Sequence, residues 1–141
     1  KFEYVENDEE GTNFDFYIEE GDVKVFFEIK YTEKGFGKAE NDDSHIRKFN
    51  NVYTKMLQKC QCLKDNKVEF DEFRKSYQLY RNVLRVTDKN KYVVFVFPKE
   101  NEGVKKQYDA FSKKINGNVI CLYWEDIVDK DSELYKKYFA E

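Results

Sequence analysis

The sequence predicts one mixed α/β domain, in which an antiparallel N-terminal meander continues into a mixed sheet flanked by helices. Three observations predict this fold. Alternating apolar and polar residues near the N-terminus indicate strands joined by tight turns. Apolar residues at helical spacing follow them, and a later continuous apolar run indicates a strand covered on both faces. The length of 141 residues suits a single domain, so we expect residues 1–141 to fold as one unit.

The first three expected strands cover residues 2–5, 13–19 and 23–31. A hairpin turn signal, Glu20–Gly21–Asp22, makes the last two strands direct neighbours. In the second strand, one face is expected to carry Phe14, Phe16 and Ile18, with Asp15 on the other face. The third strand has an apolar face formed by Val23, Val25, Phe27, Ile29 and Tyr31. Its second face carries Lys24, Phe26, Glu28 and Lys30.

Two helices are expected next, over about 42–63 and 69–86, because apolar residues recur there at steps of three and four. The residues Asp42, Asp43 and Ser44 offer N-cap chemistry to the first of them. Both helices carry apolar stripes, which are expected to pack on the sheet.

The C-terminal part is expected to alternate strands and helices. Residues 92–97 form a central strand, and a helix over 104–115 ends before Gly117. A strand then covers 119–124, and the tail to Tyr138 is helical. Strands that are reached across helices usually run parallel to a neighbour, so the complete sheet is mixed.

Composition limits the classes of function. Aromatic residues make up 18% of the chain, which argues against disorder although 38% of residues are charged. The net charge of −3 means that any contact with nucleic acid must use a local basic patch or bound cations. Neither a membrane-spanning apolar run nor a signal peptide is visible. The spacing of Cys60, Cys62 and Cys121 fits no zinc pattern, so we expect reduced thiols in a cytoplasmic protein.

Two carboxylates and one amine are expected to meet on one face of the meander. Asp15 lies in the middle of the second strand, while Glu28 and Lys30 lie two residues apart on the third strand. Burying such charges costs free energy unless they are paired or bind a metal. The pattern therefore predicts a metal site with Asp15 and Glu28 as ligands and the Ile29 carbonyl as an additional ligand.

Oxygen ligands with few protein contacts suit Mg²⁺, which keeps several waters and accepts phosphate oxygens; Mn²⁺ is the alternative. Such a metal can polarise a phosphodiester, lower the pKa of a water and stabilise a leaving oxygen. A neighbouring Lys30 can orient the attacking water or stabilise charge in the transition state. Asp15, Glu28 and Lys30 are thus the expected catalytic residues.

A competing interpretation needs no chemistry. Glu and Lys at alternate positions are common on solvated strands, and Glu-x-Lys by itself has little specificity in a chain with so many charged residues. An acidic residue on the preceding strand, Asp15, is what separates the catalytic interpretation from the solvated one.

At these residues the sequence resembles the PD-(D/E)xK superfamily of restriction-endonuclease-like proteins. The resemblance is most specific over residues 13–37. It includes Asn-Phe-Asp-Phe-Tyr at 13–17, the strand ending Glu-Ile-Lys-Tyr-Thr-Glu at 28–33 and the Gly-Phe-Gly loop at 35–37. A later helix carries further matching residues: Tyr77, Gln78, Arg81 and Asn82.

The resemblance implies a restriction-endonuclease-like nuclease domain, with Asp15 and Glu28 as metal ligands and Lys30 as the catalytic lysine. One departure is that the superfamily core usually opens with a helix, which sometimes adds an acidic ligand. This sequence starts near the first strand. Either that helix was removed or the fold is abbreviated, and Glu3 cannot be assigned its role.

Substrate contacts are expected from the second helix and from the glycine-flanked loop. A polar stripe runs along that helix, formed by Arg74, Gln78, Arg81 and Arg85. Within it, Arg81 can clamp a phosphate, and Gln78 can hydrogen-bond a ligand or Lys30. Lys34 and Lys38 can contact the nucleic-acid backbone. The alternative for the stripe is an ordinary solvated helix face.

Three further candidates have simpler interpretations. His45, the sole histidine, is expected to be a surface residue of a helix cap rather than a ligand or base. Cys60 and Cys62 are expected to be structural rather than redox-active. Trp124 is expected in the core.

The resulting hypothesis is a Mg²⁺-dependent endo- or exonuclease that hydrolyses nucleic acid, with DNA favoured over RNA. The first alternative is a catalytically inactive module on the same fold that binds nucleic acid or a protein. The second is a regulatory or structural protein whose motif residues coincide by chance. Strand specificity, sequence preference and a requirement for a homodimer stay open.

Overall fold

The computed structural model describes residues 2–5, 10–133 and 136 of the chain. It is a mixed α/β fold built on a five-stranded sheet with the strand order β1-β2-β3-β4-β5. The strands are β1 (Phe2–Val5), β2 (Asn13–Glu20), β3 (Val23–Ile29), β4 (Lys91–Phe97) and β5 (Val119–Tyr123). The first three run antiparallel, whereas β3, β4 and β5 are parallel to one another. This confirms the predicted meander and the predicted mixed sheet.

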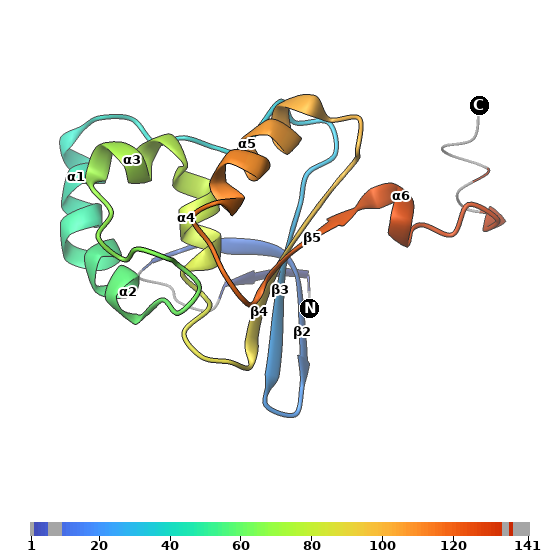
Figure 1. Cartoon of the computed structure of the whole chain (residues 1–141), viewed down its shortest axis with the longest axis horizontal. Helices are drawn as coiled ribbons and strands as arrows, with labels where there is room; N and C mark the ends of the chain where they lie inside the picture. Colours follow the sequence, from blue (N-terminus) through green and yellow to red (C-terminus); the bar gives the residue numbers. More distant parts are fainter. Residues whose placement is uncertain (1, 6–9, 134–135, 137–141) are drawn as a thin grey trace.

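Local sequence explains the hairpin between β2 and β3. Glu20 pairs with Val23 across a two-residue turn, and Gly21 adopts a positive φ of 58° there. Such turns favour a first residue that tolerates positive φ, which glycine does without steric cost. The hairpin extends away from the helices in Figure 1, and its tip is exposed to solvent.

The helices occupy the connections that the sequence predicts, with different limits. They are α1 (Asp43–Lys48), a π-helical segment η1 (Phe49–Tyr53), α2 (Thr54–Lys59), α3 (Phe70–Lys75), α4 (Tyr77–Val83), α5 (Glu102–Ser112) and α6 (Trp124–Ile127). Asp42 caps α1 by accepting from the His45 N–H at 2.9 Å, and Asn101 caps α5 by accepting from the Val104 N–H at 3.2 Å.

Three predicted helix limits were wrong. The first helical region ends at Lys59 instead of about 63, because Cys60 takes an extended conformation. The second is divided at Ser76, which caps one helix and opens the next. The helix expected over 104–115 is shifted to Glu102–Ser112, since Asn101 caps its start. The expected helical tail lies partly outside the described residues.

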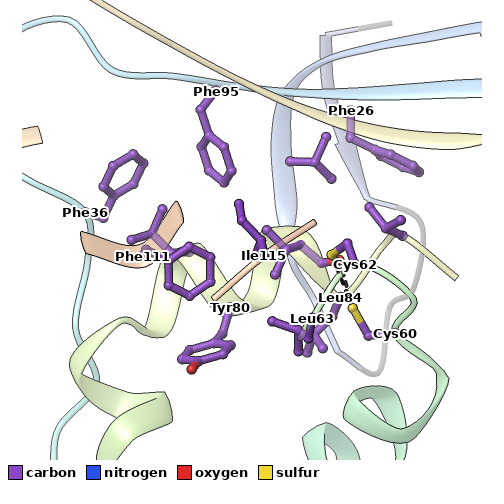
Figure 2. Packing of buried hydrophobic residues seen from close by; sticks show 14 of the residues in the cluster. Phe26, Phe36, Cys60, Cys62, Leu63, Tyr80, Leu84, Phe95, Phe111 and Ile115 are labelled. Atoms are coloured by element: carbon purple, nitrogen blue, oxygen red, sulfur yellow. Dashed lines mark hydrogen bonds between the residues drawn. The ribbon is translucent and has the colours of Figure 1, made fainter. Parts of the chain in front are cut away.

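Helices α1 to α4 gather at one end of the molecule and α6 lies at the other, with α5 between them (Figure 1). Apolar side chains from η1, α2, α3, α4 and α5 bury the sheet face that carries Phe26 and Phe95 (Figure 2). Tyr80 from α4 meets Phe111 from α5 with ring centroids 4.9 Å apart, and Phe36 packs edge-on against Phe95 at 5.5 Å. This cluster is the main hydrophobic core. None of the helices in the described part is long and apolar enough to cross a membrane.

The prediction of which sheet face is apolar and covered was wrong. On β3 the covered face is the one with Phe26 and Glu28, which are 0% and 3% exposed, whereas Val23 on the other face is 40% exposed. Both faces of β3 carry apolar residues, so period-two alternation alone does not tell which face the helices cover. Glu28 is therefore inside the protein, at the edge of the main core.

The predicted alternation in β2 was also wrong. Phe14 and Tyr17 are the buried residues, at 0% and 3% exposure, while Ile18 is 42% exposed. Both buried rings contact Phe26, with centroids 4.9 and 5.1 Å away. Residues three apart lie on opposite faces of a regular strand. The alternation is thus interrupted between Phe14 and Tyr17, at the point where Asp15 lies.

Candidate active site

Asp15 lies where β2 and β3 stop pairing. The two strands pair from Glu20–Val23 to Phe16–Phe27. Directly beyond the last pair, Asp15 Oδ2 accepts a hydrogen bond from the backbone N–H of Ile29 at 2.7 Å. The Asp15 carboxylate therefore accepts a backbone hydrogen bond where the pairing of β2 with β3 has ended. This bond holds it beside the end of β3, where Glu28 and Lys30 are located.

Glu28 is a buried carboxyl with two direct partners. Its Oε1 accepts from Lys30 Nζ at 2.8 Å and from Gln78 Nε2 at 2.6 Å. Burial raises the pKa of Glu28 above its ordinary value against the opposing effect of Lys30, and the negative charge of Asp15 raises it further. The ionised form of Glu28 is thus under-stabilised, which is the condition under which an additional cation is favourable.

Lys30 lies between two carboxylates. It is 9% exposed, and its Nζ is 3.8 Å from Glu33 Oε1 in addition to its contact with Glu28. The other oxygen of Glu33 accepts from the Tyr31 N–H at 2.8 Å. The pKa of Glu33 lies below its ordinary value. The small degree of burial of Glu33 raises this pKa, but backbone hydrogen bonds and the Lys30 charge outweigh that effect. Glu33 therefore fixes the Lys30 ammonium next to the backbone that follows β3.

Gln78, on α4, joins Glu28 to the glycine-flanked loop. While its Nε2 donates to Glu28, its Oε1 accepts from the Gly37 N–H at 2.9 Å. The Gln78 N–H donates in turn to the Gly37 carbonyl at 3.1 Å. The sequence predicted that Gln78 bonds a ligand or Lys30. The described contact is instead with the carboxylate that Lys30 also binds.

Asn82 follows Gln78 by one helical turn, so both amides lie on the same side of α4. It is 1% exposed, and among the described residues its Nδ2 has no hydrogen-bond partner. Its amide nevertheless lies close enough to Glu28 to act weakly to lower the pKa of that carboxyl. An unsatisfied buried N–H group is uncommon. Its place next to Glu28 makes Asn82 a further polar group of the site, whose role the sequence alone did not suggest.

A second buried acid, Glu10, was missed by the sequence-based interpretation. It is 0% exposed. Its carboxylate accepts from Arg81 Nε at 2.9 Å, from Tyr53 Oη at 3.0 Å and from Arg85 Nη2. Burial raises its pKa, but Arg85, Thr12 and Arg81 together outweigh this effect and hold the pKa of Glu10 below its ordinary value.

The residues of the predicted polar stripe therefore have different partners and do not form one continuous surface. Arg74 lies on α3 and pairs with Asp71 at 2.5 Å. Arg85 is 3% exposed, so an ordinary solvated helix face does not describe it. Arg81 lies over the Tyr77 ring, 5.0 Å from its centroid, in addition to its contact with Glu10. The contact with Glu10 uses one of five N–H donors of Arg81, and phosphate binding by Arg81 stays a prediction.

Lys34 and Lys38 are exposed on the loop between β3 and α1. The Lys34 carbonyl lies against Gly103 at the start of α5, where a Cβ atom would collide with it. Lys38 borders a cavity of about 220 Å³ together with Lys75 and Lys114. Both residues are exposed on the loop that Gln78 holds, and their contact with a nucleic-acid backbone stays a prediction.

Of the three remaining candidates, His45 lies in a helix cap as expected, whereas the expected structural role of Cys60 and Cys62 stays a prediction. His45 Nδ1 lies 2.8 Å from Asp42 Oδ1, within the cap of α1. Cys60 and Cys62 are free and buried, with Sγ atoms 3.5 Å apart. Placing Trp124 in the core was wrong: it is half-buried at the start of α6, because β5 ends one residue before it.

Within the described residues, no group of three or more His, Cys, Asp or Glu side chains is placed to hold a metal ion. A metal at this site would instead use the two carboxylates of Asp15 and Glu28 with backbone oxygen. Each carboxylate has a second oxygen besides the one in the contacts above.

Comparison with known proteins identifies a family for this chain. No curated protein matches the chain, and no solved structure does. A family model described as "Restriction Endonuclease associating with ARP" matches residues 1–140. That range includes every residue of the site described above, and the chain therefore belongs to this restriction-endonuclease family.

Proposed function

We propose that this protein is a PD-(D/E)xK nuclease that uses Mg²⁺ to hydrolyse phosphodiester bonds in DNA. The observation that carries the proposal is the arrangement of Asp15, Glu28 and Lys30. A buried carboxyl with a raised pKa contacts an amine at 2.8 Å, and a second carboxylate is fixed beside it by a backbone hydrogen bond. The restriction-endonuclease family of the chain supports DNA as the substrate.

The residues fit a small divalent cation. The Asp15 charge raises the cost of ionising Glu28, which a nearby cation would lower. Mg²⁺ needs few protein ligands because it keeps waters and takes phosphate oxygens. The N–H of Ile29 points to Asp15, and in an extended strand the C=O of a residue lies on the same side as its N–H. We therefore assign Asp15, Glu28 and the Ile29 carbonyl as the ligands, with Mn²⁺ as a substitute metal.

The bound metal would polarise the phosphate, lower the pKa of the attacking water and stabilise the leaving oxygen. Lys30 has a separate task. Its ammonium, positioned by Glu28 and Glu33, donates hydrogen bonds to the attacking water or to the charge that develops on the phosphate oxygens. Since Lys30 is 9% exposed, little water competes for these bonds.

Gln78 keeps the site in one geometry. By holding Glu28 and Gly37 at once, it fixes the side chain that binds metal relative to the loop that carries Lys34 and Lys38. We propose that these two lysines contact the DNA backbone, which lets a protein with a net charge of −3 bind a polyanion locally.

The test is cleavage of supercoiled plasmid and of linear DNA in Mg²⁺. Asp15→Asn and Lys30→Ala are expected to reduce cleavage by about a hundredfold or more, with unchanged circular dichroism. Glu20→Gln and Lys24→Ala are matched controls on the same two strands, and both should cut like the wild type. If Asp15→Asn and Lys30→Ala also cut like the wild type, the site assignment fails. RNA of the same sequence is expected to be a poorer substrate.

A second candidate is a catalytically inactive binding module on the same fold. The family description names an association with ARP, which favours this binding role. We propose that this chain also associates with ARP. Calorimetric titration with Mg²⁺ or Mn²⁺ separates the two candidates. The nuclease proposal expects metal binding that Asp15→Asn removes, whereas an inert module shows no binding that depends on Asp15.

A further inference from the structure

A surface pocket of about 610 Å³ lies beside the candidate active site. It is formed where the chain leaves the ends of β3, β4 and β5, and residues from all three segments line it: Tyr31, Pro98, Glu100, Trp124, Glu125 and Lys130. Ligands of sheets with parallel strands commonly bind outside the carboxyl ends of those strands. None of the roles assigned above uses this pocket.

Two aromatic rings form one corner of the pocket. The Tyr31 ring lies 6.1 Å from the Trp124 ring, measured between centroids, with 63° between their planes. Tyr31 is 46% exposed, which makes it one of the exposed large hydrophobic residues of the described part of the chain. An exposed ring in a pocket is a suitable stacking surface for a flat ligand, and nucleobases stack on Tyr and Trp without regard to their identity.

One residue that lines the pocket is the chain neighbour of the proposed catalytic lysine. Tyr31 follows Lys30 in the chain, so their Cα atoms are about 3.8 Å apart. Glu33 also contacts both Lys30 and Tyr31. One of its oxygens accepts from the Tyr31 backbone N–H, and the other lies 3.8 Å from Lys30 Nζ. A base on Tyr31 would thus lie next to the chain segment that carries Lys30.

The polar groups of the pocket select for a base rather than for a phosphate. Two carboxylates, Glu100 and Glu125, line it against one cation, Lys130. Carboxylates repel a phosphate, but they accept hydrogen bonds from exocyclic amino groups. Adenine, cytosine and guanine carry such groups, whereas thymine presents carbonyl oxygens and a methyl group. The lining therefore favours bases with an amino group.

We propose that this pocket binds one unpaired nucleobase of the substrate next to the bond that is cut. Tyr31 and Trp124 supply the stacking surface, and Glu100 and Glu125 accept from an amino-bearing base. The inference rests on the proposed function only for the position of the cleaved bond. It implies that the protein acts on single-stranded, frayed or flipped-out nucleotides, since a base inside a duplex cannot enter a pocket.

The chain provides its own reporter, because Trp124 is its only tryptophan. The full protein is titrated without Mg²⁺ with the hexanucleotides d(A)₆, d(C)₆ and d(T)₆ while Trp124 emission is recorded. A saturable change is expected, with tighter binding of d(A)₆ and d(C)₆ than of d(T)₆. Tyr31→Leu should weaken binding roughly tenfold, which is the effect of losing one stacked base. The matched control Tyr31→Phe keeps the ring and should bind like the wild type.

The two proposals fail in different ways. No saturable emission change, equal binding by Tyr31→Leu, or equal binding of d(A)₆ and d(T)₆ would overturn the base pocket, even if the wild type cuts DNA. If emission changes as expected but the wild type cuts no DNA in Mg²⁺, the pocket stands and the nuclease proposal fails. Glu100→Gln supplies an independent measurement, because it should reduce the preference for d(A)₆ and d(C)₆ without removing stacking.

Discussion

Asp15 and Ile29 are joined by a 2.7 Å hydrogen bond in which the acid accepts from the backbone at the end of β3. The bond lies directly beyond the last residue pair of the hairpin. It fixes a carboxylate by main-chain geometry instead of by side-chain packing. An amide oxygen can accept the same hydrogen bond, so the charge of Asp15 can be removed while its position is kept.

Asp15→Asn should therefore change electrostatics more than stability. Because the Asp15 charge raises the pKa of Glu28, its removal is expected to lower that pKa. The free energy of unfolding should change by about 0.5 kcal/mol or less. Titration of the Glu28 carboxyl by ¹³C NMR measures the first effect, and urea denaturation measures the second. The control Glu20→Gln, which changes an exposed acid on the same strand, should leave the pKa of Glu28 unchanged. If Asp15→Asn also leaves the pKa of Glu28 unchanged, Asp15 and Glu28 are not close to each other.

Glu28→Gln is expected to stabilise the metal-free protein at high pH. The pKa of Glu28 in the folded state lies above its ordinary value of 4.5, mainly through burial. Its contribution to stability is thus fully present below the ordinary value and is lost as pH rises through the folded-state pKa. A neutral glutamine avoids that loss and still accepts from Lys30. The gain should be about 0.5–2 kcal/mol at pH 8.

The same comparison at pH 4 is the control for Glu28→Gln, because glutamic acid is then largely protonated and the difference from glutamine should be small. Urea denaturation in a chelator measures both values. A variant that is less stable than the wild type at pH 8 would mean that the pairing with Lys30 outweighs the burial of Glu28.

Glu10→Gln should destabilise the fold strongly. The substitution removes the carboxylate charge that pairs with the buried Arg85 and the partly buried Arg81. Removing one partner of a buried ion pair costs about 3–5 kcal/mol. Glu19→Gln, at an exposed position of β2, is the matched control and should cost far less. Thermal unfolding of both variants at pH 7 tests the prediction, and equal melting temperatures would contradict it.

The sign of the pH dependence of Glu10 is opposite to that of Glu28. Since the folded-state pKa of Glu10 lies below its ordinary value of 4.5, its stabilising contribution is present above that value and is lost as pH falls through the folded-state pKa. The stability difference between wild type and Glu10→Gln should therefore shrink in acid. A difference that is constant from pH 7 to pH 3 would assign the cost to packing instead of to charge.

Gly103→Ala is expected to disturb the site from a distance. A Cβ atom at Gly103 would collide with the Lys34 carbonyl, a backbone atom that cannot rotate away. The strain should cost about 1–3 kcal/mol, and cleavage should fall because the loop that follows Lys30 has to move. Gly37→Ala is the control: its Cβ would lie 3.6 Å from Gln78 Oε1, an ordinary contact. Equal stability of the two variants would contradict the predicted collision.

Local signals were sufficient to predict the meander and the meeting of Glu28 with Lys30. Gly21 and the alternation in β3 depend on residues close in the chain, and the hairpin register follows from them. The meeting of Glu28 and Lys30 also follows from period two and is confirmed by their 2.8 Å contact. The mixed sheet was predictable because helices separate its later strands.

Tertiary contacts decide what the sequence did not reveal. Glu10 lies in a segment rich in acidic residues, but its arginine partners come 71 and 75 residues later. The burial of both Phe14 and Tyr17 requires the interruption at Asp15, which no propensity encodes. The division of the second helical region at Ser76 was missed because its apolar spacing continues without a break.

The order in which the chain is synthesised gives Gln78 a further consequence. Asp15, Glu28 and Lys30 leave the ribosome long before α4, which arrives 50 residues after Glu28. A nascent chain that has made only the hairpin would keep these charges hydrated. Dehydration of Glu28 waits for α4, so the complete candidate site is expected to form late in folding, and partly synthesised chains would not carry it.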